Sequence, residues 1–357
     1  MNTYAVIMAG GGGTRFWPLS RQKKPKQLLN LTGRELMVNE AVDRLTYLAD
    51  RKDIFIVTNT AQAQRMKSAV KDRIEPENIL SEPAARNTAA CIGFAAMTIV
   101  KKHGDGVMVI TPSDHYIRDT AAFVRIMNKA VKTAENTEKL VTVGIKPAFP
   151  ATGFGYIKYT DDANAARQVI EFKEKPDLET AEKYVASGEY AWNSGMFVWR
   201  AGVILEKFRE YIPDIYEKLE EIGASMGSEQ EAETIERVYP EIRNISVDYA
   251  IMEPSAAKGD VMVIPGEFGW NDVGSWDMMD VLHEHDENGN VCIGDTVAVE
   301  TTDTVLYSSG RLVTAVGVDG LVIVDTPDVV MVCRKDNAQS VKKIVDKLNA
   351  SHREELL

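Results

Sequence analysis

The sequence of 357 residues has few cysteines and no long apolar run. Its three cysteines, Cys91, Cys292 and Cys333, are odd in number, widely spaced and embedded in apolar stretches. They are therefore expected to be buried thiols in a reducing compartment, and neither disulfides nor zinc ligands. No segment approaches the length of a membrane span, and a strand pattern begins directly after Met1-Asn2-Thr3. We therefore expect a cytoplasmic protein without a membrane partner.

Basic residues are too few for a nucleic-acid-binding surface. Lys and Arg number 41 against 53 Asp and Glu, which gives a formal net charge of -12. A surface that follows a nucleic-acid backbone needs excess positive charge over a whole face, so we expect no nucleic-acid partner. The remaining composition, 45% hydrophobic and 26% charged, is typical of a globular protein long enough for one large and one small domain.

Negative charge is missing from the N-terminal stretch, where no Asp or Glu precedes Glu35. An apolar run from Tyr4 to Ala9 predicts a buried strand, and four glycines follow it. Glycine lets the backbone turn sharply and approach a ligand closely, and successive N–H groups in such a loop can bind phosphate oxygens. The basic residues behind this loop are Arg15, Arg21, Lys23, Lys24 and Lys26. The local reversal of charge predicts a polyphosphate site.

Two well-known phosphate loops do not fit this stretch. The Walker pattern requires Gly-Lys followed by Ser or Thr, whereas Thr14 and Arg15 follow Gly13. The dinucleotide fingerprint requires an acidic residue about 20 positions further on, at a strand end, and Glu35 lies in a helical pattern instead. The structural alternative is a flexible glycine turn before a solvated basic loop, but residues 16–19 are too apolar for a solvated linker.

Short apolar strands alternate with longer helical patterns as far as residue 144. We expect strands at residues 4–9, 54–58, 79–80, 107–111 and 140–144, and helices at 34–49, 61–71, 87–102 and 121–134. This alternation predicts an α/β fold with a doubly wound, mostly parallel sheet. Such sheets bind ligands beyond the carboxyl ends of their strands, where residues 10–13 and 111–115 both fall.

The pattern changes twice further along the chain. Strands at 155–159 and 168–172, several helices between Asp177 and Glu253, and a strand at 261–264 predict an insertion in the same domain. After Trp276, a polar turn-rich segment leads to short strands rich in Val and Thr. They predict a small all-β module at about 290–334, followed by an amphipathic helix at 338–348. We therefore predict a large domain at 1–286 and a C-terminal β module with its helix at 287–357.

Two aspartates stand out by their positions. Asp114 ends a fully apolar strand, so it either bonds its own turn or, beside a triphosphate, holds Mg²⁺. Asp272 lies among glycines and tryptophans that would fix it rigidly. Its structural alternative is a helix N-cap before Val273.

The stretch from Gly10 to Gln27 resembles the signature of the sugar-1-phosphate nucleotidylyltransferases. Its form, Gly-Gly-Thr-Arg-Phe-Trp-Pro-Leu-Ser-Arg with Pro25-Lys26-Gln27, is similar to that of the mannose-1-phosphate guanylyltransferases, or GDP-mannose pyrophosphorylases. The resemblance covers nearly the whole chain through separate motifs in the expected order. It implies a Rossmann-like nucleotide-diphospho-sugar transferase fold, a left-handed β-helix-like terminal module and a homodimer.

The resemblance also implies a reaction, GTP + α-D-mannose 1-phosphate → GDP-mannose + diphosphate, with Mg²⁺ as cofactor. The residues implied to be catalytic are Arg15, Lys26, Asp114, Lys175 and Asp272, of which Asp114 and Asp272 would hold the metal. Those implied to bind the nucleotide are Ala9, Gly10, Gly11, Gly12, Gly13, Thr14, Arg15, Lys26, Glu82, Asn87 and Asp114. Those implied to bind the sugar phosphate are Gly155, Glu174, Lys175, Asn193 and Asp272.

The chemistry of these residue types agrees with the implied roles, although each has a structural alternative. A carboxylate such as Glu82 can accept from the N1–H and the amine of guanine, and the motif around it also starts a helix. Glu174 could accept from sugar hydroxyls and Lys175 could pair with a phosphate, but Lys-Glu-Lys is also typical of an exposed strand end. Asn193 lies in an aromatic stretch that could be core packing alone.

Two other functions remain open. One is a nucleotidyltransferase for another sugar 1-phosphate or another nucleotide. The other is a non-catalytic regulatory homologue that binds sugar nucleotides, although such a protein could lose its basic and metal-binding residues, and all of them are present here. Some relatives carry a fused isomerase as a further C-terminal β-barrel, and we expect none in this chain.

Overall fold

The computed structural model describes residues 1–162 and 164–357, which fold into two compact units. Unit 1 consists of Met1–Gly10, Ala41–Ser113 and Ile117–Trp270. Unit 2 consists of Gly11–Glu40, Asp114–Tyr116 and Asn271–Leu357. The units interleave along the chain, so the division into 1–286 and 287–357 stays a prediction.

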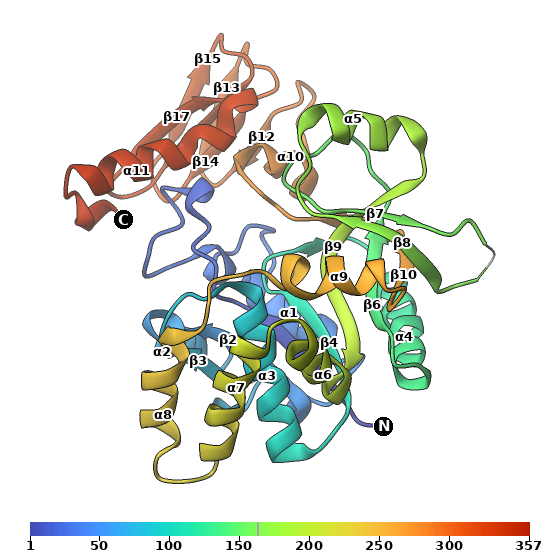
Figure 1. Ribbon diagram of the computed structural model, residues 1–357. Helices are drawn as coiled ribbons and strands as arrows, with labels where there is room; N and C mark the ends of the chain where they lie inside the picture. Colours follow the sequence, from blue (N-terminus) through green and yellow to red (C-terminus); the bar gives the residue numbers. More distant parts are fainter. Residues whose placement is uncertain (163) are drawn as a thin grey trace. The chain divides into compact units, whose positions relative to one another are not determined.

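Unit 1 is built on a sheet whose strand order is β3-β2-β1-β4-β9-β6-β10-β8-β7 (Figure 1). β1 pairs in parallel with both β2 and β4, and β6 pairs in parallel with β10, whereas β9 is antiparallel to both β4 and β6. The strands are β1 (Thr3–Met8), β2 (Ile54–Asn59), β3 (Ile79–Glu82), β4 (Val107–Pro112), β6 (Leu140–Ile145), β7 (Tyr156–Tyr159), β8 (Arg167–Lys173), β9 (Tyr190–Arg200) and β10 (Val261–Gly266). The predicted α/β class with parallel β1, β2, β3 and β4 is therefore confirmed.

The helices of unit 1 pack on this sheet. α3, α6 and α7 pack against one another and α8 packs against α7, while α4 contacts β4, β6, β9 and β10 (Figure 1). The helices are α2 (Thr60–Ala69), α3 (Asn87–His103), α4 (Thr120–Asn136), α5 (Leu178–Ser187), α6 (Ala201–Tyr211), α7 (Pro213–Ser225), α8 (Glu231–Val238) and α9 (Glu253–Ala257), and α1 (Met37–Leu45) contains residues of both units. Within the described part of the chain, each helix is too short or too polar to cross a bilayer.

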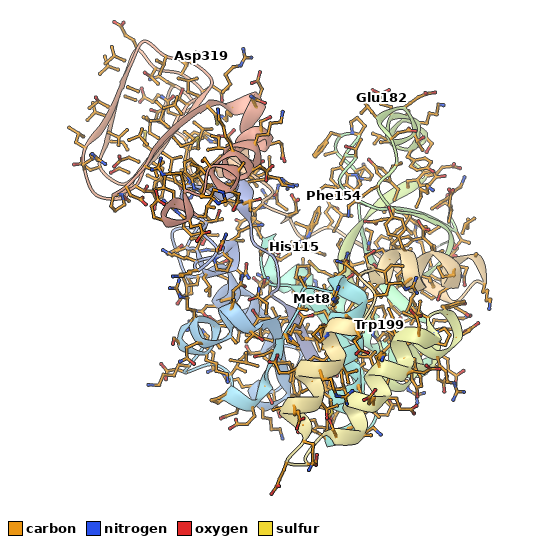
Figure 2. All side chains as sticks on the ribbon, turned by 60° about the vertical axis from the view of Figure 1, so that its left-hand side comes forward. Met8, His115, Phe154, Glu182, Trp199 and Asp319 are labelled. Carbon is orange, nitrogen blue, oxygen red and sulfur yellow. The ribbon has the colours of Figure 1, made fainter. Side chains whose placement is uncertain are left out.

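The core of unit 1 is aromatic and aliphatic. Trp199, labelled in Figure 2, is fully buried on β9, and its ring stacks on that of Phe197 at a centroid distance of 5.2 Å. Both belong to one apolar cluster with residues of α3, α6 and α7, such as Phe208 and Leu219. Burying one such side chain stabilises the fold by about 1.5–3 kcal/mol.

Unit 2 contains the small β module. β12, β14 and β16 form parallel pairs, β17 is antiparallel to β16, and β13 pairs in parallel with β15. Its elements are α10 (Met279–Leu282), β12 (Val291–Ile293), β13 (Thr296–Val299), β14 (Val305–Ser308), β15 (Val313–Val316), β16 (Leu321–Asp325), β17 (Val330–Arg334) and α11 (Lys342–Ala350). Two short strands, β5 (Tyr116–Ile117) and β11 (Trp270–Asn271), lie where the chain passes between the units.

The core of unit 2 joins three distant parts of the sequence. Phe16 and Trp17 from the N-terminal stretch are buried with Trp276, with Val305 of β14 and with Val345 of α11. The indole Nε1 of Trp276 donates to the carbonyl oxygen of Trp17 at 3.0 Å. Residues 16–19 are apolar because they form this core, which removes the alternative of a solvated loop.

Several local predictions need correction. The helix expected at 34–49 begins only at Met37, so Glu35 lies outside it. A strand, β9, was missed within the region assigned to helices. All three cysteines are free, as predicted, but only Cys91 is buried, because Cys292 is exposed and Cys333 is half-buried.

Candidate functional site

The glycine loop ends in a conformation that requires glycine. Gly13 has a φ of 61°, and a Cβ at this position would lie 2.3 Å from the Cβ of Lys26. By contrast, a Cβ at Gly11 would meet nothing within 4 Å, so the space beside this residue is open to a ligand. The short 3₁₀ helix Thr14–Phe16 follows directly and places Arg15 next to the loop.

Lys26 is the centre of a charged cluster in unit 2. Its side chain is only 6% exposed, and its Nζ donates to Oδ2 of Asp114 at 3.0 Å and to the carbonyl oxygen of Asp272 at 2.7 Å. A buried ammonium is costly unless it is paired, so these contacts hold both acidic segments at Lys26. The structure thus brings together Lys26, Asp114 and Asp272, three of the residues that the resemblance implies to be catalytic.

These groups line a pocket of about 320 Å³. Arg15 belongs to the lining, and its Nη1 lies 3.4 Å from the carbonyl oxygen of Gly274. The complete lining is Gly13, Thr14, Arg15, Lys26, Asp114, His115, Asp272, Gly274 and Lys342. Lys342, which comes from α11, was not among the predicted residues.

The two carboxylates of the pocket have opposite pKa shifts. Burial alone would raise the pKa of Asp114, but the charges of Lys26 and His115 outweigh it and hold this pKa below the usual value. For Asp272, burial and the negative charge of Asp114 raise the pKa more than Lys26 and Arg15 lower it. A cation between the two carboxylates would relieve this repulsion.

Asp272 is not a helix cap. The amide of Val273 donates to Oδ1 of Asn271 at 2.7 Å, and Val273 has a left-handed φ of 47°. The next helical turn begins only at Trp276, with Ser275 as its N-cap residue. The structural alternative for Asp272 is therefore wrong.

A second cluster, in unit 1, contains the residues predicted for the sugar phosphate. Glu174 is buried and pairs with Lys175 at 3.0 Å, and its Oε2 has no hydrogen-bond partner among the described residues. A Cβ at Gly155 would lie 2.5 Å from this Oε2 and 3.2 Å from the Cβ of Asn193, so only glycine fits there. This buried carboxylate oxygen can therefore accept a hydrogen bond from a ligand or from an ordered water.

Asp248 completes this cluster and was missed. It begins the π-helix Asp248–Met252, and its Oδ1 accepts from Nδ2 of Asn193 at 2.9 Å. Asn193 is fixed at its other end, because its Oδ1 accepts from Oγ1 of Thr142 at 3.0 Å. Burial and the neighbouring Glu174 raise the pKa of Asp248 to about 7. In sequence, Asp248 stands between Val247 and Tyr249, outside the motifs that carry the resemblance.

The residues predicted for the nucleotide base also lie in unit 1. Glu82 ends β3 and is buried, and a Cβ at the exposed Gly10 would lie 3.4 Å from its Oε2. Its Oε1 accepts a short hydrogen bond from the phenol of Tyr239, which sequence reasoning missed. Burial raises the pKa of Glu82, and the Tyr239 bond partly opposes this shift. Asn87 is exposed at the start of α3, with a left-handed φ of 67°.

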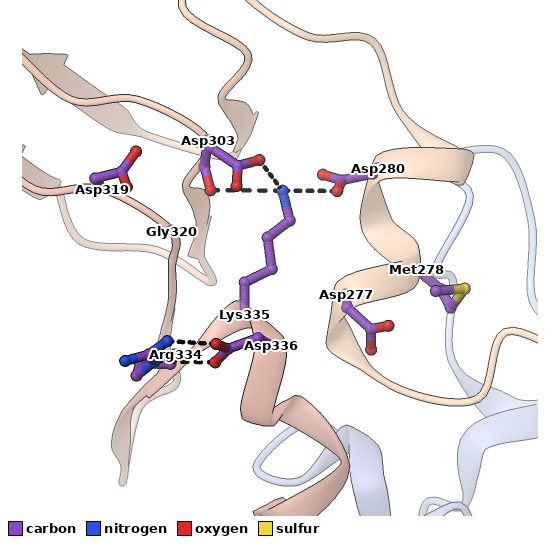
Figure 3. A pocket seen from close by; sticks show the side chains of 9 residues that line it. All are labelled: Asp277, Met278, Asp280, Asp303, Asp319, Gly320, Arg334, Lys335 and Asp336. Atoms are coloured by element: carbon purple, nitrogen blue, oxygen red, sulfur yellow. Dashed lines mark hydrogen bonds and ion pairs between the residues drawn. The ribbon is translucent and has the colours of Figure 1, made fainter. Parts of the chain in front are cut away.

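A larger pocket in unit 2, of about 750 Å³, does not have the chemistry of a phosphate site (Figure 3). Its lining is mainly acidic, and its two cations are already paired. Lys335 lies between Asp280 at 2.6 Å and Asp303 at 2.5 Å, and Arg334 pairs with Asp336. An anion would therefore be repelled from this pocket.

Comparisons with known proteins agree with the fold. The chain matches the family described as nucleotidyl transferase over residues 4–289, and the family described as MannoseP isomerase/GMP-like β-helix domain over residues 294–348. It is 40% identical over 365 residues to mannose-1-phosphate guanylyltransferase of Escherichia coli (strain K12), covering 99% of this chain and 74% of that protein. It is 39% identical over 351 residues to the xanthan biosynthesis protein XanB of Xanthomonas campestris pv. campestris (strain B100), covering 98% and 74%.

A solved structure is similar over nearly the whole chain. It is described as mannose-1-phosphate geranyltransferase from Thermus thermophilus, and it matches with a TM-score of 0.87 and 32% identity over 98% of this chain and 100% of that chain. The β module at the C-terminus is thus a recognised part of the relatives, as the sequence predicted. The chain therefore belongs to the mannose-1-phosphate guanylyltransferase family of nucleotidyl transferases.

Proposed function

We propose that this enzyme catalyses GTP + α-D-mannose 1-phosphate → GDP-mannose + diphosphate. The observation that carries the proposal is the pocket of unit 2, in which Arg15 and Lys26 lie with Asp114 and Asp272 beside a glycine loop. Basic groups next to two carboxylates are suited to a triphosphate and its metal, and the 40% identical relative from Escherichia coli bears the name of this activity.

The reaction requires charge neutralisation more than proton transfer. An oxygen of the sugar phosphate attacks the α-phosphorus of GTP in line, a new P–O bond forms, and diphosphate leaves with the electrons of the broken bond. A phosphate monoester has its second pKa near 6, so this oxygen is already ionised at pH 7 and needs no general base. The obstacle is repulsion between two polyanions, and Arg15 and Lys26 would reduce it at the triphosphate.

Asp114 and Asp272 would hold Mg²⁺. Mg²⁺ typically takes one or two carboxylates and completes its shell with water and phosphate oxygens, so two aspartates in one pocket fit this ion. Burial and the neighbouring charge of Asp114 raise the pKa of Asp272, and a bound cation would favour its ionised form. When bound, the ion neutralises charge on the phosphates.

The sugar phosphate would bind at the cluster of unit 1. Glu174 and Asn193 would bond the sugar hydroxyls, Lys175 would pair with the 1-phosphate, and Gly155 would allow the sugar to approach the backbone. The orphaned Oε2 of Glu174 supports this assignment, because an acceptor-only carboxylate can bridge hydroxyl groups.

The guanine base would bind near Glu82. A carboxylate held by Tyr239 offers its second oxygen to the N1–H and amine of guanine, which adenine does not present in this form. Ala9, Gly10 and Asn87 would complete the nucleoside contacts, with Gly11, Gly12 and Thr14 at the phosphates.

The proposal includes a homodimer in the cytoplasm. Val297, Val299 and Val316 are exposed on the paired strands β13 and β15, and such apolar faces are typical of subunit contacts. Light scattering of the intact chain at increasing concentration tests the dimer, which a persistent monomer would exclude. The exposed free thiol of Cys292 supports a reducing compartment, and localisation of a tagged protein by fluorescence microscopy tests it.

A coupled diphosphate-release assay tests the activity. GTP, ATP, UTP and dTTP are each combined with mannose 1-phosphate and with glucose 1-phosphate, in Mg²⁺ and after its removal by EDTA. We expect turnover chiefly with GTP and mannose 1-phosphate, and only with the metal. Preference for another pair of substrates would assign another nucleotidyltransferase activity, and no turnover with any pair would favour a regulatory homologue.

A further inference from the structure

The C-terminal helix contributes a cation to the triphosphate pocket. Lys342 is the first residue of α11 and lines the same pocket of about 320 Å³ as Arg15, Lys26, Asp114 and Asp272. Its side chain is exposed, and within the described part of the chain its ammonium has no hydrogen-bond or ion-pair partner. Lys26, by contrast, is already engaged by Asp114 and by the carbonyl oxygen of Asp272.

The charge of the pocket depends on this lysine. Among the described lining residues other than His115, the charges of Arg15 and Lys26 are balanced by those of Asp114 and Asp272. Lys342 therefore adds a positive charge beyond these balanced pairs before any metal binds. A triphosphate is the most highly charged substrate of the proposed reaction, and an unpaired ammonium in its pocket would attract it.

The position of Lys342 is fixed by the packing of α11 in unit 2. Val341 and Val345, on either side of it in the chain, are buried in the same core as Phe16 and Val273, which adjoin Arg15 and Asp272. Nε2 of Gln339 donates to Oγ of Ser275 at 2.7 Å, which ties the preceding turn to the loop after Asp272.

The end of the chain adds a further tie. Nε1 of Trp17 donates to the carbonyl oxygen of Leu356 at 2.8 Å, and Nη1 of Arg21 donates to the same oxygen at 2.6 Å. The terminal segment thus binds the N-terminal signature at two points. The packing of α11 and these hydrogen bonds therefore fix the backbone of Lys342 beside the pocket.

We propose that Lys342 is a phosphate-binding residue of the enzyme, supplied by the C-terminal module and paired with the β- or γ-phosphate of the nucleoside triphosphate. This inference rests on the proposed function only for the identity of the nucleotide. It gives the module a direct part in substrate binding, beyond subunit contacts.

The test compares two neighbouring lysines. Lys342→Met removes the charge and keeps the apolar stem, and Lys343→Met is the matched control, because Lys343 is equally exposed on α11 but is not part of the pocket. Calorimetric titration with GTP and with GMP gives affinities without turnover. We expect Lys342→Met to weaken GTP binding about tenfold or more, to change GMP binding by less than about twofold, and to leave the melting temperature unchanged.

Kinetics supply the second measurement. Lys342→Met should raise KM for GTP by a similar factor while KM for mannose 1-phosphate stays within about twofold, and Lys343→Met should change neither. Lys342→Arg, which keeps the charge, should restore most of the GTP affinity. Equal loss of GTP and GMP binding, or equal effects of the two methionine variants, would overturn the proposal.

The two proposals can fail separately. If the wild type does not turn over GTP and mannose 1-phosphate, the proposed function fails, and titration with inorganic tripolyphosphate still tests Lys342. Weaker tripolyphosphate binding by Lys342→Met than by Lys343→Met would support the inference in that case. Normal wild-type turnover with unchanged GTP binding in Lys342→Met would overturn the inference alone.

Discussion

Asp248 offers a prediction in which the free energy of unfolding depends on pH. Its carboxylate lies close to that of Glu174, and burial and this neighbour raise its pKa to about 7 from a value of 3.8. The perturbation is Asp248→Asn, which is isosteric. The amide oxygen of Asn at this position can still accept the 2.9 Å hydrogen bond from Asn193, so the change removes charge while it retains the contact.

The sign of this pH dependence follows from whether the folded protein or the unfolded chain binds the proton of Asp248 more tightly. A raised pKa in the folded state means that the folded protein holds this proton better than the unfolded chain does. The stabilisation is complete below pH 3.8 and is lost as the pH rises through 7. Three pKa units correspond to about 4 kcal/mol, of which about 2–3 kcal/mol falls between pH 5 and pH 8. The Asn variant has no such loss.

The assay is urea unfolding of both proteins at pH 5 and at pH 8, followed by circular dichroism. The free energy of unfolding of Asp248→Asn minus that of the wild type should be about 2–3 kcal/mol larger at pH 8 than at pH 5. If this difference in the free energy of unfolding is the same at pH 5 as at pH 8, the reasoning is refuted. Asp260→Asn is the pH-independent control, because burial of Asp260 is outweighed by the hydrogen bonds that it accepts from Lys207 and Lys139, which lower its pKa below 3.8. Asp260 is therefore ionised at both pH values, and that variant should lose about the same stability at pH 5 as at pH 8.

Four further substitutions test the assigned roles by steady-state kinetics. Asp272→Asn should lower kcat on the order of a hundredfold with an unchanged melting temperature, and activity above about a tenth of the wild type at saturating Mg²⁺ would contradict its role. Lys175→Ala should raise KM for mannose 1-phosphate far more than KM for GTP, and Lys26→Ala should do the reverse, so equal effects on both substrates would reject the assignment. Tyr239→Phe removes the donor that holds Glu82, so it should raise KM for GTP about fivefold or more while KM for mannose 1-phosphate stays constant. If this variant discriminates between GTP and ATP as well as the wild type does, the role assigned to Tyr239 is contradicted.

The sequence predicted most of the first half of the fold because its signals are local. Apolar runs of five residues between helices of twelve or more predicted the parallel strands from β1 to β4, and each lies within two residues of its predicted position. The loop after β1 and Asp114 after β4 were predicted at carboxyl ends of strands for the same reason, and the structure adds that β1 and β4 are paired in parallel.

β9 was missed because a polar Asn-Ser-Gly segment, typical of a turn, interrupts its strand-forming aromatic and apolar residues. Asn193, Ser194 and Gly195 interrupt the apolar residues, and Gly195 has a positive φ of 69° in the middle of the strand. The pairing with β6 shifts register between Thr142 and Gly144, which accommodates this irregularity. β9 forms because β4 and β6 both need a hydrogen-bonding partner at the position between them. This requirement comes from the tertiary fold and not from the local sequence.

The missed site residues share a physical explanation. Asp248 and Tyr239 lie in segments with no motif, and each is identified only by a contact across a large sequence separation, to Asn193 and to Glu82. Lys342 is a surface lysine in sequence and a pocket residue only because α11 packs beside the 3₁₀ helix that carries Arg15.

The aromatic residues of the signature connect these observations. A glycine loop needs no aromatic neighbours to bind phosphate, yet Phe16 and Trp17 follow it directly and are buried. Their burial partners include Trp276, just after Asp272, and residues of the C-terminal module. The same core therefore supports the loop, the segment of the second aspartate and the helix of Lys342. Since a side chain that loses its packing partners shifts or exposes apolar surface, a cavity made in this core should disturb the pocket around Lys26 before it affects the cluster around Glu174 in unit 1.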